Sequence, residues 1–171
     1  MSKQAAPFEI FRARDAQGYM ESGVQFMEPP SPDDSKMAET LLSEGFGAGG
    51  DVRLLYRRPG MSLAYVWFKS GYPLPRHSHS ADCLYFIVAG SLRIGTEELG
   101  PGDGFFLGTD VPYTYVPGEK GVEVLEFRTS DHFDFKSLGN TPAWLEKAVQ
   151  SLRANRDNWA GEPTPSGMKV G

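Results

Sequence analysis

The sequence predicts an all-β domain, a barrel or sandwich, flanked by one helix before it and one after it. Between residues 51 and 128, short runs of β-branched and aromatic residues recur, and glycine or proline stands in nearly every gap. The segments on either side carry helix-start residues followed by a helical stretch. The longest uninterrupted apolar run, LYFIVA, is far too short to cross a membrane.

Residues 1–50 form an arm ahead of the β-rich part. Its first half holds two short apolar pieces, FEIF and VQFM, which predict irregular or edge strands. The stretch SPDDSKMAETLLSEG then predicts a helix over about residues 32–44. Ser31 can cap this helix, Pro32 suits its first position, and Gly45 ends it.

The predicted barrel covers residues 51–130. Its strands are expected in the runs VRLLYR, SLAYVWF, CLYFIVA, SLRIG, GFFLG, YTYV and VEVLEF. Residues 131–171 hold a second helix, expected at 142–154 with Thr141 as its cap, and a flexible tail rich in glycine and proline. Each part is too short to be a further domain, so the sequence predicts one domain with two extensions.

Composition excludes several classes of function. The net charge is −5, which is unsuited to a nucleic-acid partner. No apolar segment suits a membrane span or a secretion signal at the start of the chain. A single cysteine, Cys83, cannot form an intramolecular disulfide, so we expect a cytoplasmic protein.

A pair of histidines is the first candidate for chemistry. His77 and His79 are separated by one residue, and alternate residues of a strand point to the same face. Their imidazoles can therefore converge on one metal ion. Cys83 follows four residues later and, as a thiolate, would be a soft ligand.

The surroundings of this pair resemble the first motif of the cupin superfamily, G-x5-H-x-H-x(3,4)-E-x6-G. Gly71 lies six residues before His77, and Gly90 lies seven residues after Cys83. Every spacing fits, but Cys83 occupies the position of the glutamate.

The stretch PGDGFFLGTDVPYTYVPG resembles the second cupin motif, G-x5-P-x-G-x2-H-x3-N. Counting from Gly102 puts Gly108 at the motif proline, Asp110 at its second glycine, Tyr113 at its histidine and Pro117 at its asparagine. The resemblance covers roughly residues 60–130 and implies an antiparallel cupin β-barrel of the jelly-roll type.

The resemblance also implies a site inside the barrel. By position, the ligands of one divalent transition metal would be His77, His79, Cys83 and Tyr113. Zinc suits two histidines and a thiolate, with iron, nickel and copper as alternatives. Five aromatic residues are expected to line a substrate pocket: Tyr65, Trp67, Tyr85, Phe105 and Tyr115.

Two functions fit these residues. One is a metal-dependent cupin enzyme with dioxygenase, lyase or isomerase chemistry on a small organic or aromatic substrate, with Tyr113 as a ligand or a general acid. The other is a non-catalytic binding or sensor module whose metal site is degenerate, with the histidines as polar lining. Thiol dioxygenases, cupins that also carry cysteine at the glutamate position, join that cysteine to a tyrosine as a thioether, so a Cys83–tyrosine link is a further alternative. In either case the resemblance implies a homodimer and a small-molecule ligand, with no further cofactor.

Overall fold

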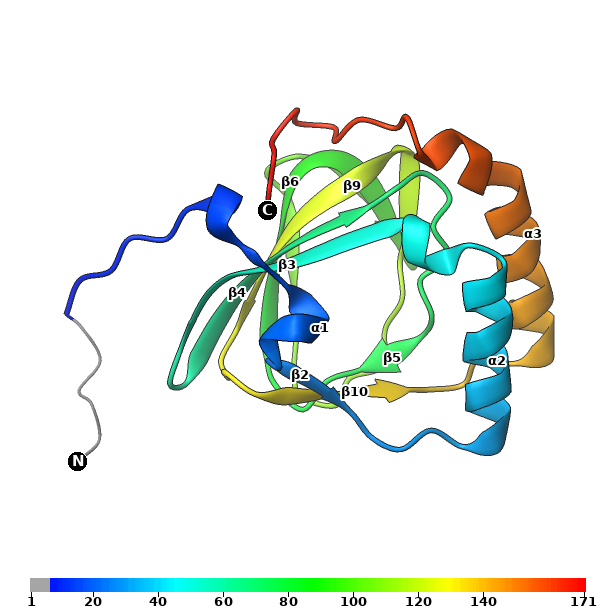
Figure 1. Cartoon of the computed structure of the whole chain (residues 1–171), viewed down its shortest axis with the longest axis horizontal. Helices are drawn as coiled ribbons and strands as arrows, with labels where there is room; N and C mark the ends of the chain where they lie inside the picture. Colours follow the sequence, from blue (N-terminus) through cyan, green and yellow to red (C-terminus); the bar gives the residue numbers. More distant parts are fainter. Residues whose placement is uncertain (1–6) are drawn as a thin grey trace.

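Long antiparallel strands between Gly50 and Arg128 form the centre of the molecule (Figure 1). The structure is a computed structural model and describes residues 7–171, so the first six residues of the expected N-terminal arm lie outside the described residues. The strands are β1 (Gln17–Gly18), β2 (Gln25–Met27), β3 (Gly50–Arg58), β4 (Met61–Phe68), β5 (His77–Ser78), β6 (Cys83–Ile94), β7 (Glu97–Leu99), β8 (Gly104–Leu107), β9 (Val116–Arg128) and β10 (Phe133–Ser137). The helices are α1 (Tyr19–Ser22), α2 (Pro32–Ser43) and α3 (Pro142–Trp159), with short 3-10 turns at Ala13–Asp15 and Phe46–Ala48.

The strands form two sheets. The larger has seven strands in the order β1-β3-β4-β9-β6-β7, with β8 also paired to β6, and the smaller has the order β2-β10-β5. All pairs in the larger sheet are antiparallel, whereas β2 and β10 run parallel. The predicted all-β fold with flanking helices is confirmed, and its strands form two sheets rather than one closed barrel.

Strand β10 was not expected from the sequence, which predicted only a helix and a tail after residue 130. Its five residues place Phe133 in the core and pair with β2 on one side and β5 on the other. The smaller sheet therefore joins the N-terminal arm, the histidine segment and the region after β9. The β-rich part of the chain therefore continues past residue 130, where the sequence pattern predicted it to end.

Alternation along β6 and β9 decides which side chains enter the barrel. Cys83 pairs with Arg128, Tyr85 with Glu126, and Ile87 with Val124 across the two strands. All six side chains are buried, because they lie on the inner face of the larger sheet. An acid and a base thus take inward positions among apolar neighbours.

The two long helices lie side by side along one flank of the sheets (Figure 1). Ser31 caps α2 by accepting a hydrogen bond from the N–H of Asp34, and Thr141 caps α3 in the same way from Trp144. Helix α3 is longer than predicted and ends at Trp159, whose fully buried ring adds a further contact to the core. Arg153 and Arg156 of α3 form ion pairs with Glu44, which follows α2.

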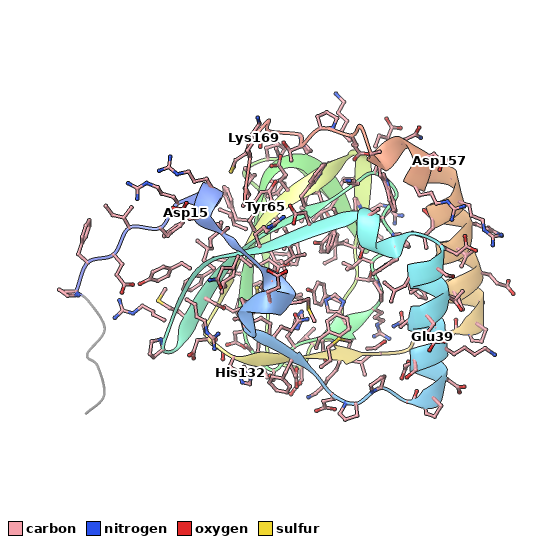
Figure 2. All side chains as sticks on the ribbon, in the orientation of Figure 1. Asp15, Glu39, Tyr65, His132, Asp157 and Lys169 are labelled. Atoms are coloured by element: carbon pink, nitrogen blue, oxygen red, sulfur yellow. The ribbon has the colours of Figure 1, made fainter. Side chains whose placement is uncertain are left out.

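The C-terminal tail was expected to be flexible, but it lies against the outer face of the larger sheet. Ser166 donates to the carboxylate of Glu123 through its backbone N–H and its hydroxyl, at 2.5 and 2.7 Å. The hydroxyl of Tyr65, labelled in Figure 2, donates to the same carboxylate at 2.6 Å. These bonds satisfy a fully buried acid and hold the tail in place.

Two backbone positions agree with the motif alignment. Gly90 has a φ of +73°, and a Cβ there would lie 2.2 Å from the carbonyl oxygen of Gly121, so a side chain does not fit. Asp110, which stands where the second motif has a glycine, is the one non-glycine residue among residues 7–171 with a left-handed φ, at +61°. Within the described part of the chain, no helix has the length and apolar character that a membrane crossing requires.

Candidate functional site

A cavity of about 550 Å³ lies between the two sheets. The larger sheet contributes Val66, Phe68, Glu126 and Arg128 to its lining, among others. The smaller sheet and its neighbouring segments contribute residues that include Gln25, His77, His79, Tyr113 and Phe135. Short helix α1 supplies Tyr19 at one edge. The volume lies within the range that small-molecule sites usually occupy.

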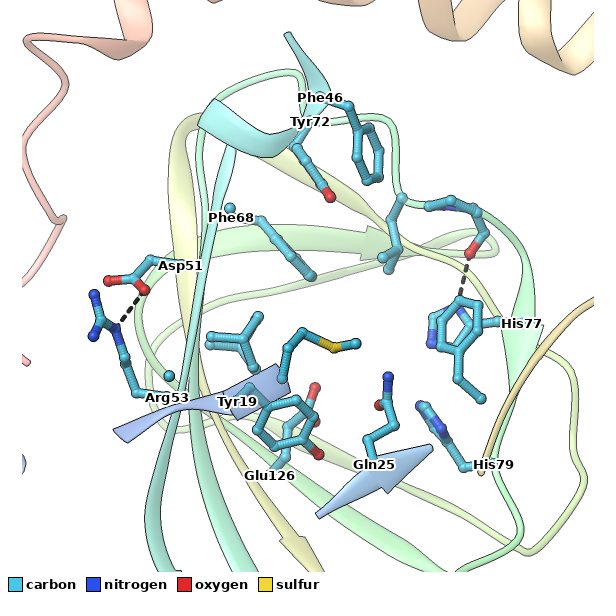
Figure 3. Close-up of a pocket in the computed structure, with 18 of the residues that line it drawn as sticks. Tyr19, Gln25, Phe46, Asp51, Arg53, Phe68, Tyr72, His77, His79 and Glu126 are labelled. Carbon is cyan, nitrogen blue, oxygen red and sulfur yellow. Dashed lines mark hydrogen bonds and ion pairs between the residues drawn. The ribbon is translucent and has the colours of Figure 1, made fainter. Parts of the chain in front are cut away.

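One side of this cavity is aromatic and largely apolar, whereas the other side combines polar side chains with further aromatic rings (Figure 3). Phe46, Phe68 and Tyr72 lie together on one side, with Phe68 stacked on Tyr72 at 4.5 Å between ring centroids. On the other side, Figure 3 shows Glu126 next to Tyr19, and Gln25 toward His79. A ligand would therefore meet an apolar wall and a polar wall.

His77 and Tyr113 are held together by their backbones. The N–H of His77 donates to the carbonyl of Tyr113 at 3.0 Å, and the N–H of Tyr113 donates to the carbonyl of His77 at 2.8 Å. Residues paired in this way project to the same face of a sheet. The two side chains consequently meet, with 2.9 Å between Nε2 of His77 and the hydroxyl of Tyr113.

The protonation of both imidazoles follows from their partners. Nδ1 of His77 lies 2.7 Å from the carbonyl oxygen of Pro75, and Nδ1 of His79 lies 2.7 Å from that of Asp134. A carbonyl oxygen only accepts, so each Nδ1 carries the hydrogen and each neutral ring keeps its lone pair on Nε2. Burial lowers the pKa of His77 to about 4 and that of His79 to about 2, and the positive charge of Arg128 acts in the same direction. Both rings are neutral at pH 7.

A directed chain of hydrogen bonds ends at His77. Arg128 Nη2 lies 3.4 Å from the hydroxyl of Tyr85, which donates to the hydroxyl of Tyr113 at 2.8 Å. Tyr113 can then donate only to the lone pair of His77. Burial raises the pKa of Tyr85 and of Tyr113 well above the ordinary value, so both hydroxyls keep their hydrogens at neutral pH.

Glu126 and Arg128 are site residues that the sequence pattern alone did not predict. Nη1 of Arg128 lies 2.6 Å from Oε2 of Glu126 and 3.4 Å from the hydroxyl of Tyr19. The guanidinium also lies over the ring of Phe133, 4.5 Å from its centroid. Both side chains line the cavity and are buried, so the pair places one compensated charge of each sign inside the barrel.

Cys83 points into the barrel, on the inner face of β6 opposite Arg128. It is not among the residues that line the cavity. Burial raises the pKa of its thiol to about 12, which keeps the sulfur protonated at neutral pH. The cysteine is therefore a small buried side chain behind the cavity wall in this structure.

The five aromatic residues expected in the pocket divide into three groups. Tyr115 lines the cavity. Tyr85 and Phe105 stack on each other at 4.4 Å between ring centroids, inside the barrel but behind the lining. Tyr65 and Trp67 lie instead on the outer face of β4, because Val66 and Phe68 take the inward positions of that strand. Further aromatic lining comes from Tyr113, a predicted site residue, and from five residues that the motifs did not predict: Tyr19, Phe46, Phe68, Tyr72 and Phe135.

The donor set only partly suits the metal that the resemblance implies. The imidazoles of His77 and His79, with centroids 4.9 Å apart and lone pairs on Nε2, have the tautomer that a metal ligand needs. No third histidine, cysteine or carboxylate joins them within residues 7–171. Nε2 of His77 already accepts the hydroxyl of Tyr113, which a metal would have to displace. The described residues therefore do not fit a zinc centre, which takes at least three protein ligands.

No protein-family model matches the sequence, and no curated protein sequence matches it. Similar folds occur among solved structures. The polyketide cyclase RemF from Streptomyces resistomycificus superposes with a TM-score of 0.50 and 18% identity, over 61% of this chain and 84% of that one. KdgF from a Halomonas species gives a TM-score of 0.43 and 22% identity, over 47% of this chain and 79% of that one.

A salicylate 1,2-dioxygenase mutant from Pseudoaminobacter salicylatoxidans, solved with gentisate, gives a TM-score of 0.47 and 15% identity, over 63% of this chain and 36% of that one. Other neighbours are described as RmlC-like cupins. At these identities the likeness establishes the fold and leaves the activity to the site itself. The antiparallel two-sheet architecture and the superposition on RemF support the cupin fold that the two sequence motifs predicted.

Proposed function

We propose that this chain binds a small organic molecule in the cavity between its sheets, and that polar side chains of the cavity wall hold the ligand there by hydrogen bonds. The observation that carries the proposal is the hydrogen-bonded chain from Arg128 through Tyr85 and Tyr113 to His77. This chain satisfies the lone pair of His77 with protein groups alone. Consecutive hydrogen bonds between buried groups hold Tyr85, Tyr113 and His77 in fixed orientations at the cavity wall, although Nε of Arg128 has no partner among the described residues.

The same chain favours binding over acid catalysis by Tyr113, the general acid suggested by the sequence. Its hydroxyl already donates to His77, and its raised pKa makes proton release unfavourable at neutral pH. His79, with a pKa lowered to about 2 by burial, is a weak base. Both residues are better suited to hydrogen bonding with a ligand than to moving a proton.

A test of this proposal uses indole, a neutral aromatic probe small enough for the cavity. Isothermal calorimetry on the full chain should show binding. Val52→Trp should abolish it, because Val52 lines the cavity and a larger ring there fills the space. Val116→Trp adds the same bulk at an exposed position outside the lining and should leave binding unchanged. No heat with the native chain, or equal heat with Val52→Trp, would contradict the proposal.

The metal-dependent enzyme predicted from the sequence is the second candidate. It is favoured by the two anchored imidazoles, whose Nδ1 hydrogens are tied to carbonyl oxygens. Metal analysis of protein purified without added metal or an affinity tag distinguishes the candidates. One zinc, iron, nickel or copper ion per chain, lost in His77→Ala/His79→Ala, would favour the metal enzyme.

We also propose that the chain forms the homodimer expected from the resemblance, through the outer face of the larger sheet. Four apolar side chains are exposed on neighbouring strands of the outer sheet face: Leu84, Phe86, Phe106 and Phe127. Leu84 pairs with Phe106 on one side and with Phe127 on the other, so the side chains form a continuous row. A two-fold axis through such a row would bury it against its own copy.

Light scattering after gel filtration tests the dimer. The native chain should give twice the 18.8 kDa mass of one chain, and Leu84→Glu/Phe106→Glu should give the single mass. Leu42→Glu changes an equally exposed leucine on α2 and should leave the mass doubled. A native chain that runs as a monomer would refute the dimer.

A further inference from the structure

The hydrogen-bonding capacity of the cavity indicates which ligand chemistry it accepts. The imidazole of His77 is already occupied by Tyr113, whereas Nε2 of His79 has no hydrogen bond from residues 7–171. Because Nδ1 of His79 donates to Asp134, its Nε2 can only accept. The free imidazole nitrogen of the site is thus an acceptor.

Glu126 presents a second acceptor. Its Oε2 receives the hydrogen bond from Arg128 at 2.6 Å, while Oε1 receives none from the described residues. The side chain is only 8% exposed, and it lines the cavity. Figure 3 shows Glu126, Tyr19 and Gln25 on the same side of the cavity, and Nη1 of Arg128 lies within 3.4 Å of both Oε2 of Glu126 and the hydroxyl of Tyr19. Oε1 is not among the fully buried side-chain atoms that lack a partner, so it is accessible from the cavity, where it can accept a hydrogen bond from a ligand.

The charges around the cavity lead to the same result. Its lining includes three carboxylates, Glu21, Asp51 and Glu126, and two guanidiniums, Arg53 and Arg128. Each guanidinium is already paired with a carboxylate, at 2.6 Å in both cases. The Nδ1 hydrogens of both histidines are held by carbonyl oxygens, so neither ring has a hydrogen left to donate. An anionic ligand would therefore find no unpaired guanidinium in the lining and would face two acceptors.

We propose that the ligand is an uncharged aromatic molecule with hydroxyl groups, which donate hydrogen bonds to Oε1 of Glu126 and Nε2 of His79. This inference rests on the proposed binding function and specifies its ligand. A hydroxyl suits the site better than an ammonium group because its oxygen can also accept a hydrogen bond. The Tyr19 hydroxyl and the Gln25 amide, which line the same cavity, are potential donors. The ring would pack against Phe46, Phe68 and Tyr72.

Calorimetry with three matched probes tests the ligand class. Resorcinol carries two hydroxyls and does not chelate metals through adjacent oxygens, benzoate carries a carboxylate, and benzylamine carries an ammonium group. Resorcinol should bind at least tenfold more tightly than benzoate, and more tightly than benzylamine. Benzoate or benzylamine binding as tightly as resorcinol would overturn the inference. If indole still binds in that case, the proposed binding function is supported and only the proposed ligand class is wrong. If no probe binds, the binding function and the ligand class are both wrong.

Substitution at Glu126 tests the assigned contact. Glu126→Gln keeps the size of the side chain but frees Arg128 from its ion pair. Resorcinol should bind several-fold more weakly and benzoate more tightly than in the native chain. The ratio of the affinity for resorcinol to that for benzoate should therefore decrease or fall below one. An unchanged ratio in a folded variant would refute the role of Glu126. If the variant does not fold, His79→Leu, which removes the other acceptor, should weaken resorcinol several-fold, and unchanged binding there would also refute the inference.

Discussion

The hydroxyl of Tyr113 donates a hydrogen bond to Nε2 of His77 across 2.9 Å. By the motif alignment, this tyrosine stands where cupins usually carry a histidine, and it occupies the lone pair that a metal ion would need. A tyrosine in place of a histidine at position 113 therefore makes Nε2 of His77 a hydrogen-bond acceptor that is already occupied. The contact depends on the antiparallel bridge that pairs the two backbones.

Tyr113→Phe should destabilise the fold by about 1–3 kcal/mol, because it leaves a buried lone pair on His77 and removes the acceptor of the Tyr85 hydroxyl. Urea unfolding measures this change. Tyr115→Phe is the matched control, because the buried Tyr115 hydroxyl has no hydrogen-bond partner among residues 7–171, so its removal should not destabilise the fold. Equal losses from the two variants would show that the Tyr113 bond contributes nothing.

Stability should fall as the pH drops below about 6.5. The pKa values of His77 and His79, about 4 and about 2 in the folded chain, lie below the 6.5 of an exposed histidine. In this window the unfolded chain binds more protons than the folded one, so acid favours unfolding, by up to about 1.4 kcal/mol per pH unit for each ring. Urea midpoints between pH 7 and pH 5 measure the slope. His79→Gln should reduce the slope, and an identical slope in that variant would locate the protons elsewhere.

The Cys83 thiol should react slowly in the native chain, with or without a chelator. It is buried, and its pKa is raised to about 12, so little thiolate forms at neutral pH. Thiol labelling of native, chelator-treated and denatured protein checks this expectation, with rapid labelling only after denaturation. Faster labelling after chelation would identify Cys83 as a metal-bound thiolate. An intact mass about two hydrogens low, with no free thiol after denaturation, would instead show the thioether link to tyrosine.

The Glu126–Arg128 pair should behave as one unit in a double-mutant cycle. Arg128→Met leaves a buried carboxylate unpaired and should cost about 3–5 kcal/mol of unfolding free energy. Glu126→Gln/Arg128→Met removes both charges and should lose less than the sum of the single variants. Additive losses, measured by urea unfolding, would mean that the two groups do not interact.

The sequence predicted the parts of the site that carry a local signature. The spacing of His77, His79 and Tyr113 located three lining residues, because strand alternation and the motif glycines fix their register. The alternation within VEVLEFR also indicates two charged residues that point inward. Val122 and Val124 are inward, so Glu126 and Arg128, in the same phase, had to enter the core as charges.

Other features depend on contacts that strand patterning does not encode. Tyr19 and Gln25 reach the cavity only because β2 pairs with β10 across more than a hundred residues of sequence. Tyr65 and Trp67 were expected in the pocket because of their residue type. The alternation of β4 instead puts both side chains on the outer face of the sheet, where Tyr65 and the C-terminal tail bind the same carboxylate of Glu123. Aromatic character alone does not distinguish the two faces of a strand.

A crystal structure of the full chain, purified without added metal or an affinity tag and soaked with resorcinol, tests the central proposal most directly. We predict a planar ring in the cavity, with hydroxyls within hydrogen-bond distance of Oε1 of Glu126 and Nε2 of His79, and with Tyr113 still bonded to His77. A metal ion bound between Nε2 of His77 and Nε2 of His79 with Tyr113 displaced, or a ring bound outside the cavity, would contradict it.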